Sequence, residues 1–116
     1  MSLAVGKTGE AKACSYLRDQ GYAILETNYR FKRNEIDIIA SKNGTLVFVE
    51  VKSKSYNRFG HPEDMVDEPK AERIMETAEQ YIYENDWTGN IRFDVLALII
   101  KDRMVCEITH FEDAFH

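Results

Sequence analysis

The sequence predicts an α/β fold in which helices pack on a mixed β-sheet, with the elements in the order αβββαββ. Two observations support this prediction. An Asn43-Gly44 pair separates two apolar runs, as in a tight hairpin, and a long amphipathic stretch precedes the most apolar run of the chain. A strand that follows a helix of this length is expected to join the sheet through a crossover connection. The 116 residues suit one domain, residues 1–116.

The bounds of the elements follow from apolar spacing and from the residues that start or end them. Gly21 suits the position just after a helix, and Pro69 suits the first turn of another helix. Apolar residues recur every three or four positions in helices and alternate or run together in strands. We expect helices over residues 6–20 and 69–85 and strands over residues 22–29, 35–40, 46–53, 91–100 and 104–109.

The composition excludes several classes of protein. Hydrophobic residues make up 44% of the chain and charged residues 30%, and no apolar run approaches the roughly 20 residues of a membrane span. The N-terminus lacks the basic and apolar regions of a signal peptide. Cys14 and Cys106 are too far apart for a CxxC pair and with three scattered His form no usual zinc site. We expect a cytoplasmic protein with reduced thiols and no membrane association.

The charge is distributed unevenly along the chain. Although the net charge is −5, residues 28–60 carry seven Lys or Arg against three acids, whereas residues 61–90 carry two against nine. The three acids of the basic segment are Glu35, Asp37 and Glu50. A divalent cation bound to them would leave this segment strongly positive, and local potential governs how a polyanion approaches.

The hairpin predicted at Asn43-Gly44 brings charged residues together. A two-residue loop there sets Asp37 opposite Glu50 and Glu35 opposite Lys52, on one face of the two strands. Opposed carboxylates repel each other unless one takes up a proton or a cation binds between them. Two carboxylates are the protein donors that Mg²⁺ commonly uses, and Lys52 could reach a phosphate oxygen or the attacking water. The alternative is a solvated sheet face with a Glu35–Lys52 ion pair.

Glu10 is a further candidate acid. It precedes Ala13, Cys14 and Leu17 by three, four and seven residues, which places it on the buried stripe of the first helix. A buried carboxylate without a partner is costly, so a metal ion or a lysine is expected beside it. The alternative is an ordinary first-turn glutamate that the helix dipole stabilises.

Six basic side chains are candidates for contacts with phosphate groups of nucleic acid. They lie on the predicted edge around residue 30, in the loop after residue 53 and at the start of the second long helix. The alternatives are a basic edge strand that resists aggregation and a solvated loop. The six residues are Arg30, Lys32, Arg33, Lys54, Arg58 and Lys70.

Asp37, Glu50 and Lys52 match the D-x(n)-E-x-K pattern of the PD-(D/E)XK nuclease superfamily, with twelve residues between the two acids. Further motifs spread over nearly the whole chain resemble the YraN-like family of uncharacterised bacterial proteins. They include Gly9-Glu10, Arg30, Glu35-Ile36-Asp37-Ile38-Ile39-Ala40, Val47-Phe48-Val49-Glu50-Val51-Lys52, Phe59-Gly60 and Arg92-Phe93-Asp94-Val95.

The resemblance implies a restriction-endonuclease-like α/β fold, similar to archaeal Holliday-junction resolvases. It implies Mg²⁺ or Mn²⁺ held by Asp37, Glu50, the Val51 carbonyl and Glu10, with Lys52 as the catalytic lysine. The expected function is a metal-dependent endonuclease acting on DNA, branched or structured, with a homodimer by analogy to resolvases. One alternative is a nucleic-acid-binding or assembly module of the same fold with weak or no catalysis. Another is a nuclease directed at RNA.

Overall fold

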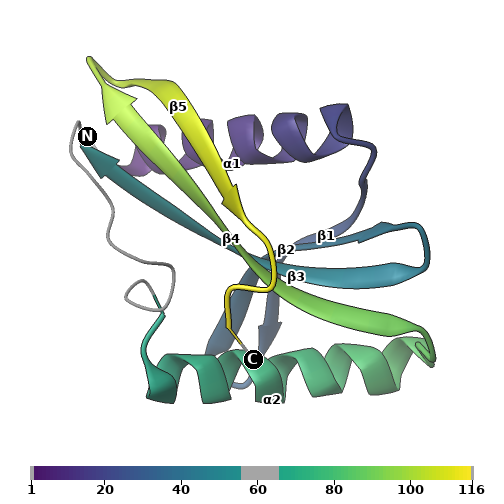
Figure 1. Cartoon of the computed structure of the whole chain (residues 1–116). Helices are drawn as coiled ribbons and strands as arrows, with labels where there is room; N and C mark the ends of the chain where they lie inside the picture. The colour runs from purple at the N-terminus through teal and green to yellow at the C-terminus, as the bar shows by residue number, and fades with distance from the viewer. Residues whose placement is uncertain (1, 56–65, 116) are drawn as a thin grey trace.

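A computed structural model describes residues 2–55 and 66–115 of the chain (Figure 1). The element order αβββαββ is confirmed. Arg58, one of the predicted phosphate contacts, lies outside the described residues. The elements are α1 (Ser2–Asp19), β1 (Ala23–Phe31), β2 (Asn34–Lys42), β3 (Thr45–Ser55), α2 (Glu68–Asn85), β4 (Asn90–Lys101) and β5 (Met104–Phe111).

The five strands form one mixed sheet in the order β1-β2-β3-β4-β5. The central pair β3–β4 is parallel, and the other three pairs are antiparallel. The parallel pair requires the predicted crossover, and α2 provides it. This architecture confirms the predicted α/β class and is compatible with a restriction-endonuclease-like fold. Neither helix of the described ranges is long and apolar enough to span a membrane.

The two helices cover opposite faces of the sheet (Figure 1). On the α1 face, Leu17 and neighbouring helix residues pack against Val47, Val49 and Leu96 of the central strands. On the α2 face, Ile74, Ala78 and Tyr81 pack against another set of buried side chains from β2, β3 and β4, namely Ile36, Ile39, Leu46, Phe48, Phe93 and Val95. Both faces are therefore apolar, as expected for a sheet buried on each side.

The local signals in the sequence act as predicted. Gly21 adopts a φ of 94°, and the N–H of Tyr22 donates to the carbonyl of Leu17, which ends α1 just after Asp19. Asn43 and Gly44 have φ values of 50° and 79°, the positive values that a type I′ hairpin turn needs.

The predicted hairpin register is confirmed from Lys42–Thr45 to Ile38–Val49 and ends there. The prediction that the ladder continues to Asp37–Glu50 and Glu35–Lys52 is wrong. In a continuous ladder the Val51 N–H would face the backbone near Ile36. It donates instead to Asp37 Oδ2 at 2.7 Å, so a side chain replaces the backbone acceptor where the strands separate.

Candidate active site

Four charged side chains interact where β2 and β3 separate. They are Asp37 of β2, Glu50 and Lys52 of β3, and Lys70 in the first turn of α2, which we call the acid–lysine cluster. Each of the four side chains influences the pKa of at least one other member. The sequence predicted the first three as a group. The register places two carboxylates beside the end of the hairpin ladder, and the docking of α2 adds the second lysine.

Glu50 is the most deeply buried acid of the cluster, with 6% of its surface exposed. Lys70 Nζ lies 3.3 Å from Glu50 Oε2, whereas Glu50 Oε1 is buried and has no hydrogen-bond partner among the described residues. Burial, and then repulsion by the Asp37 carboxylate, raise the pKa of Glu50 to about 7. One oxygen of this side chain is therefore available to a further cation or proton donor.

Asp37 is half-buried beside Glu50 and accepts the Val51 N–H bond. Burial raises the pKa of Asp37 and the nearby Glu10 carboxylate adds to the rise, although the bond from Val51 opposes both. Two neighbouring carboxylates thus both resist ionisation. A cation bound between them would remove this cost.

The two lysines of the cluster are unequal. Burial lowers the pKa of Lys52, and the nearby Lys70 ammonium lowers it further. Burial also acts to lower the pKa of Lys70, but a hydrogen bond with Lys52 and the Glu50 carboxylate outweigh it and leave the pKa raised. Lys70 is therefore the main counter-charge of Glu50. Lys52 is the lysine that more readily gives up or shares a proton.

Glu10 lies near the cluster on α1. Its side chain is half-buried, and Asn28 Nδ2 donates to Glu10 Oε1 at 3.2 Å, so one oxygen of this carboxylate has an amide donor. Gly9 brings this part of α1 close to the sheet, because a Cβ at Gly9 would meet Leu98 Cδ1 at 3.2 Å. Glu10 influences Asp37 through its charge.

A divalent cation fits the donors that the cluster offers. Across residues 2–55 and 66–115, no three His, Cys, Asp or Glu side chains gather closely enough to hold a metal alone. Mg²⁺ needs only one or two carboxylates, because water and substrate phosphate complete its octahedron. The unpartnered Glu50 Oε1 beside Asp37 supplies this arrangement.

Comparison with known proteins places the chain in a family. Residues 9–98, which include the whole acid–lysine cluster, match the uncharacterised protein family UPF0102. The chain belongs to UPF0102. This is the YraN-like family that the motifs of the sequence indicated.

Several UPF0102 proteins of bacteria are similar to the chain over most of its length. A UPF0102 protein of Cytophaga hutchinsonii is 50% identical over 93 residues, which cover 80% of this chain and 82% of the relative. UPF0102 protein FP2501 of Flavobacterium psychrophilum is 45% identical over 97% of this chain and 93% of its own length. A UPF0102 protein of Persephonella marina is 44% identical over 95% of this chain and 91% of its own length. These names state no activity.

The basic residues predicted to contact phosphate in this UPF0102 protein have different surroundings. Arg30 and Lys32 lie on or beside the edge strand β1 and pair with carboxylates, Arg30 with Glu35 at 3.5 Å and Lys32 with Glu76 at 3.6 Å. Lys54 is exposed near the end of β3. Arg33 and Lys70 line one small cleft beside the acid–lysine cluster.

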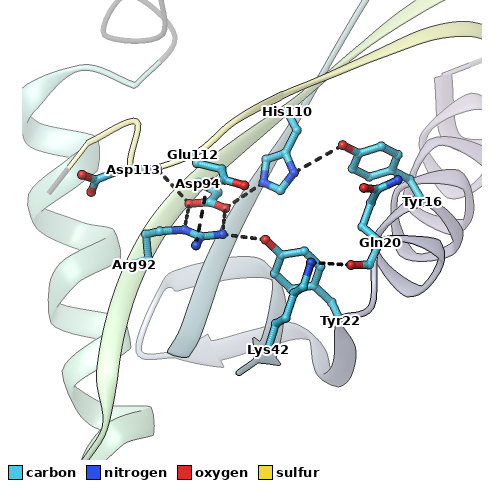
Figure 2. Close-up of polar contacts among 9 residues, drawn as sticks. All are labelled: Tyr16, Gln20, Tyr22, Lys42, Arg92, Asp94, His110, Glu112 and Asp113. Carbon is cyan, nitrogen blue, oxygen red and sulfur yellow. Dashed lines mark hydrogen bonds and ion pairs between the residues drawn. The ribbon is translucent and has the colours of Figure 1, made fainter. Parts of the chain in front are cut away.

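A second polar network of the UPF0102 protein lies on the α1 face (Figure 2). Asp94 of β4 is fully buried and accepts two hydrogen bonds from Arg92, at 2.9 and 2.8 Å. His110 Nε2 donates to Asp94 Oδ2 at 2.7 Å, and the Asp113 N–H donates to Oδ1 at 3.0 Å. Arg92 Nη2 also donates to the Tyr22 hydroxyl at 2.6 Å. Arg92 and Asp94 both belong to the Arg92-Phe93-Asp94-Val95 motif of the sequence.

The two buried acids differ in how well they are satisfied. Burial alone would raise the pKa of Asp94, but hydrogen bonds, with that from His110 the largest, outweigh it and lower the pKa. Both oxygens of Asp94 have partners, whereas one oxygen of Glu50 has none within residues 2–55 and 66–115. A fully satisfied buried carboxylate serves the fold, and a partly satisfied one marks a candidate for binding and chemistry.

Proposed function

We propose that this UPF0102 protein is a metal-dependent endonuclease that hydrolyses phosphodiester bonds of DNA. The observation that supports the proposal most is the buried, unpartnered Glu50 Oε1, next to a second carboxylate at Asp37 and two lysines. This combination favours a divalent cation and a phosphate group bound at one place. The resemblance to PD-(D/E)XK nucleases supplies the choice of DNA and of hydrolysis.

Each residue has a proposed role. Asp37 and Glu50 would hold Mg²⁺ or Mn²⁺ together with the Val51 carbonyl, and Glu10 would complete the site or orient water. The cation supplies Lewis acidity and a more acidic bound water. Lys52 donates to a phosphate oxygen and stabilises the charge that develops there in the transition state. Lys70 pairs with Glu50 and would also donate to a phosphate group bound beside it.

We also propose where the protein acts, on which DNA and in which oligomeric state. Cys14 and Cys106 are free thiols, which supports a cytoplasmic protein. Branched or structured DNA is the proposed substrate by likeness to junction resolvases. Two symmetric cuts in a junction would need two copies of the chain, so we propose a homodimer on that substrate.

The proposal is tested by incubating the purified protein with Mn²⁺ and a panel of junction, flap, duplex, single-stranded and RNA substrates. We expect cleavage of a DNA substrate by the wild type. Asp37→Ala should lower it by about 100-fold or more, because the cation then lacks a ligand. Asp102→Asn is the matched control, because Asp102 lies in the exposed β4–β5 turn and has a φ of 52°, which Asn tolerates. This variant should cleave like the wild type.

A second candidate function is a nucleic-acid-binding or assembly module without chemistry. The acidic residues 61–90 favour it, because nine acids against two basic residues suit a protein partner better than a polyanion. Calorimetric titration with Mn²⁺, with and without DNA, separates the two functions. A wild type that binds no Mn²⁺ in either titration, or an Asp37→Ala variant that cleaves equally well, contradicts the enzyme.

A further inference from the structure

A small cleft adjoins the acid–lysine cluster. It lies between the β1–β2 turn with the start of β2 on one side and the first two turns of α2 on the other. Its volume is about 140 Å³. The residues that line it are Arg33, Asn34, Glu35, Lys70, Arg73 and Ile74.

The lining of the cleft is strongly cationic. Arg33, Lys70 and Arg73 contribute three positive charges, and Glu35 is the one acid among the lining residues. Glu35 already pairs with Arg30 at 3.5 Å. Arg33 and Arg73 are exposed, and within the described residues neither guanidinium has a carboxylate within 4.0 Å. Arg33 and Arg73 therefore bring to the cleft positive charge that no carboxylate of residues 2–55 and 66–115 neutralises, whereas the charge of Lys70 is paired with Glu50.

This situation differs from that of the other basic residues nearby. Arg30 and Lys32 lie on the same side of the molecule but each has a carboxylate partner, Glu35 and Glu76. Unpaired arginines fixed around a concave surface are the groups that recognise phosphate, because guanidinium donates two parallel hydrogen bonds to its oxygens. Arg33 and Arg73 are thus better placed to take an anion than Arg30 and Lys32.

The size and position of the cleft indicate which kind of ligand it can bind. Small-molecule pockets begin at about 300 Å³, so a 140 Å³ cleft suits a single group such as one phosphate. Lys70 lines the cleft, and its Nζ lies 3.3 Å from Glu50 of the cluster. One lysine therefore joins the two places, and an anion in the cleft lies next to the proposed reacting centre.

We propose that this cleft binds a backbone phosphate of the nucleic acid, adjoining the phosphate that lies at Asp37 and Glu50. Arg73 and Arg33 donate hydrogen bonds to this second phosphate, and Lys70 lies between the two phosphates. Contacts of this kind fix the position of the strand and carry no sequence information. That the ligand is nucleic acid rests on the proposed function, whereas anion binding by the cleft does not depend on metal or on cleavage.

The test measures binding of a fluorescein-labelled DNA duplex and junction by anisotropy, in EDTA, over a range of salt concentrations. Arg73→Gln and Arg33→Gln should each weaken the affinity several-fold at low salt. Each should reduce the slope of log affinity against log salt by about 0.9, the contribution of one lost phosphate contact. Arg18→Gln, at an exposed arginine of α1 away from the cleft, is the matched control and should leave both quantities unchanged.

The outcomes separate this proposal from the nuclease. Wild-type affinity and salt slope in both Arg73→Gln and Arg33→Gln, with unchanged thermal melts, overturn the phosphate cleft. If Arg73→Gln weakens the binding of polyglutamate as much as that of DNA, the proposal is overturned as well, because the cleft would then not select phosphodiesters. Loss of binding in these variants, together with a wild type that cuts nothing in Mn²⁺, supports the cleft and contradicts the proposed nuclease.

Discussion

At the scale of single residues, Glu50 and Asp94 show how neighbouring strands place acids in opposite surroundings. In the parallel pair β3–β4, Glu50 lies opposite Val95 and Val49 opposite Asp94, so the two carboxylates leave opposite faces of the sheet. Asp94 meets donors for both oxygens, and Glu50 meets a carboxylate and one lysine. We expect Asp94 to stabilise the fold and the ionised Glu50 carboxylate to destabilise it.

We therefore predict that Glu50→Gln stabilises the metal-free protein at alkaline pH. The pKa of Glu50 is raised from 4.5 to about 7, so the folded state favours the protonated acid. The stability that protonated Glu50 contributes is fully present below pH 4.5 and is lost as the pH rises through 7, where the buried acid must ionise. The penalty above pH 7 approaches about 3 kcal/mol at about 1.4 kcal/mol per pKa unit. Gln avoids this penalty, although it also gives up the charge that pairs with Lys70.

Urea unfolding in EDTA at pH 8 and pH 5 measures the effect. The gain of Glu50→Gln should be about 1–3 kcal/mol at pH 8 and should shrink towards pH 5. Glu79→Gln changes an exposed acid of α2 and should stay within about 0.5 kcal/mol of the wild type at both pH values. A Glu50→Gln variant that is less stable than the wild type at pH 8 would show that the carboxylate serves the fold.

At the scale of elements, short-range signals in the sequence determine much of the fold. Gly21 ends α1, Asn43-Gly44 sets the hairpin and Pro69 lies in the first turn of α2, because each acts on its own backbone. The hairpin signal alone is enough to predict that Asp37 and Glu50 lie close together. The predicted register is wrong only beyond Ile38, where a side chain takes the bond of the backbone.

The remaining parts of the site depend on contacts between distant elements, which local patterns do not encode. Lys70 joins Glu50 only after α2 crosses the sheet, and Asn28 meets Glu10 across 18 residues. Arg73 showed no signal in the sequence, because an exposed helix arginine gains meaning only from the cleft that Arg33 completes. Arg58 was also predicted to contact phosphate, and that stays a prediction because it lies outside the described residues.

The Asp94 network joins three elements, because its hydrogen bonds connect β4 to β5 and to the end of α1. We predict that Asp94→Asn lowers the free energy of unfolding by about 3–5 kcal/mol at pH 7, since it leaves the half-buried Arg92 without its main charge partner. The pKa of Asp94 is lowered in the fold. Its contribution is therefore present above its unfolded value of 3.8 and is lost as the pH falls through the lower, folded value.

Denaturant unfolding at pH 7 and at progressively lower pH tests this prediction. The difference between wild type and Asp94→Asn should be largest at pH 7 and should diminish below pH 3.8, as the wild-type acid takes up its proton. Asp102→Asn, in the exposed turn between the same two strands, controls for removal of an acid and should leave stability unchanged. A loss of less than about 1 kcal/mol in Asp94→Asn would mean that the network contributes little to joining these elements.

At the scale of the whole molecule, the candidate active site uses elements from both faces of the sheet. Glu10 comes from α1, Lys70 from α2, and Asp37 with Glu50 from the two strands between them. These elements are brought together only in the folded state. A cation that binds this arrangement therefore has little affinity for the unfolded chain and stabilises the whole fold through linkage.

We predict that Mn²⁺ raises the thermal stability of the wild type, measured by calorimetry or dichroism in buffer free of other divalent ions. At a Mn²⁺ concentration of about 100 times Kd, the gain is about 2.7 kcal/mol. The gain should be larger at pH 8 than at pH 5.5, because protons compete with the cation for Glu50, whose pKa lies at about 7. Asp37→Asn and Glu50→Gln should lose most of it, whereas Asp102→Asn should keep it. An equal shift in all four proteins would assign Mn²⁺ to another place and leave the cluster without its proposed cation.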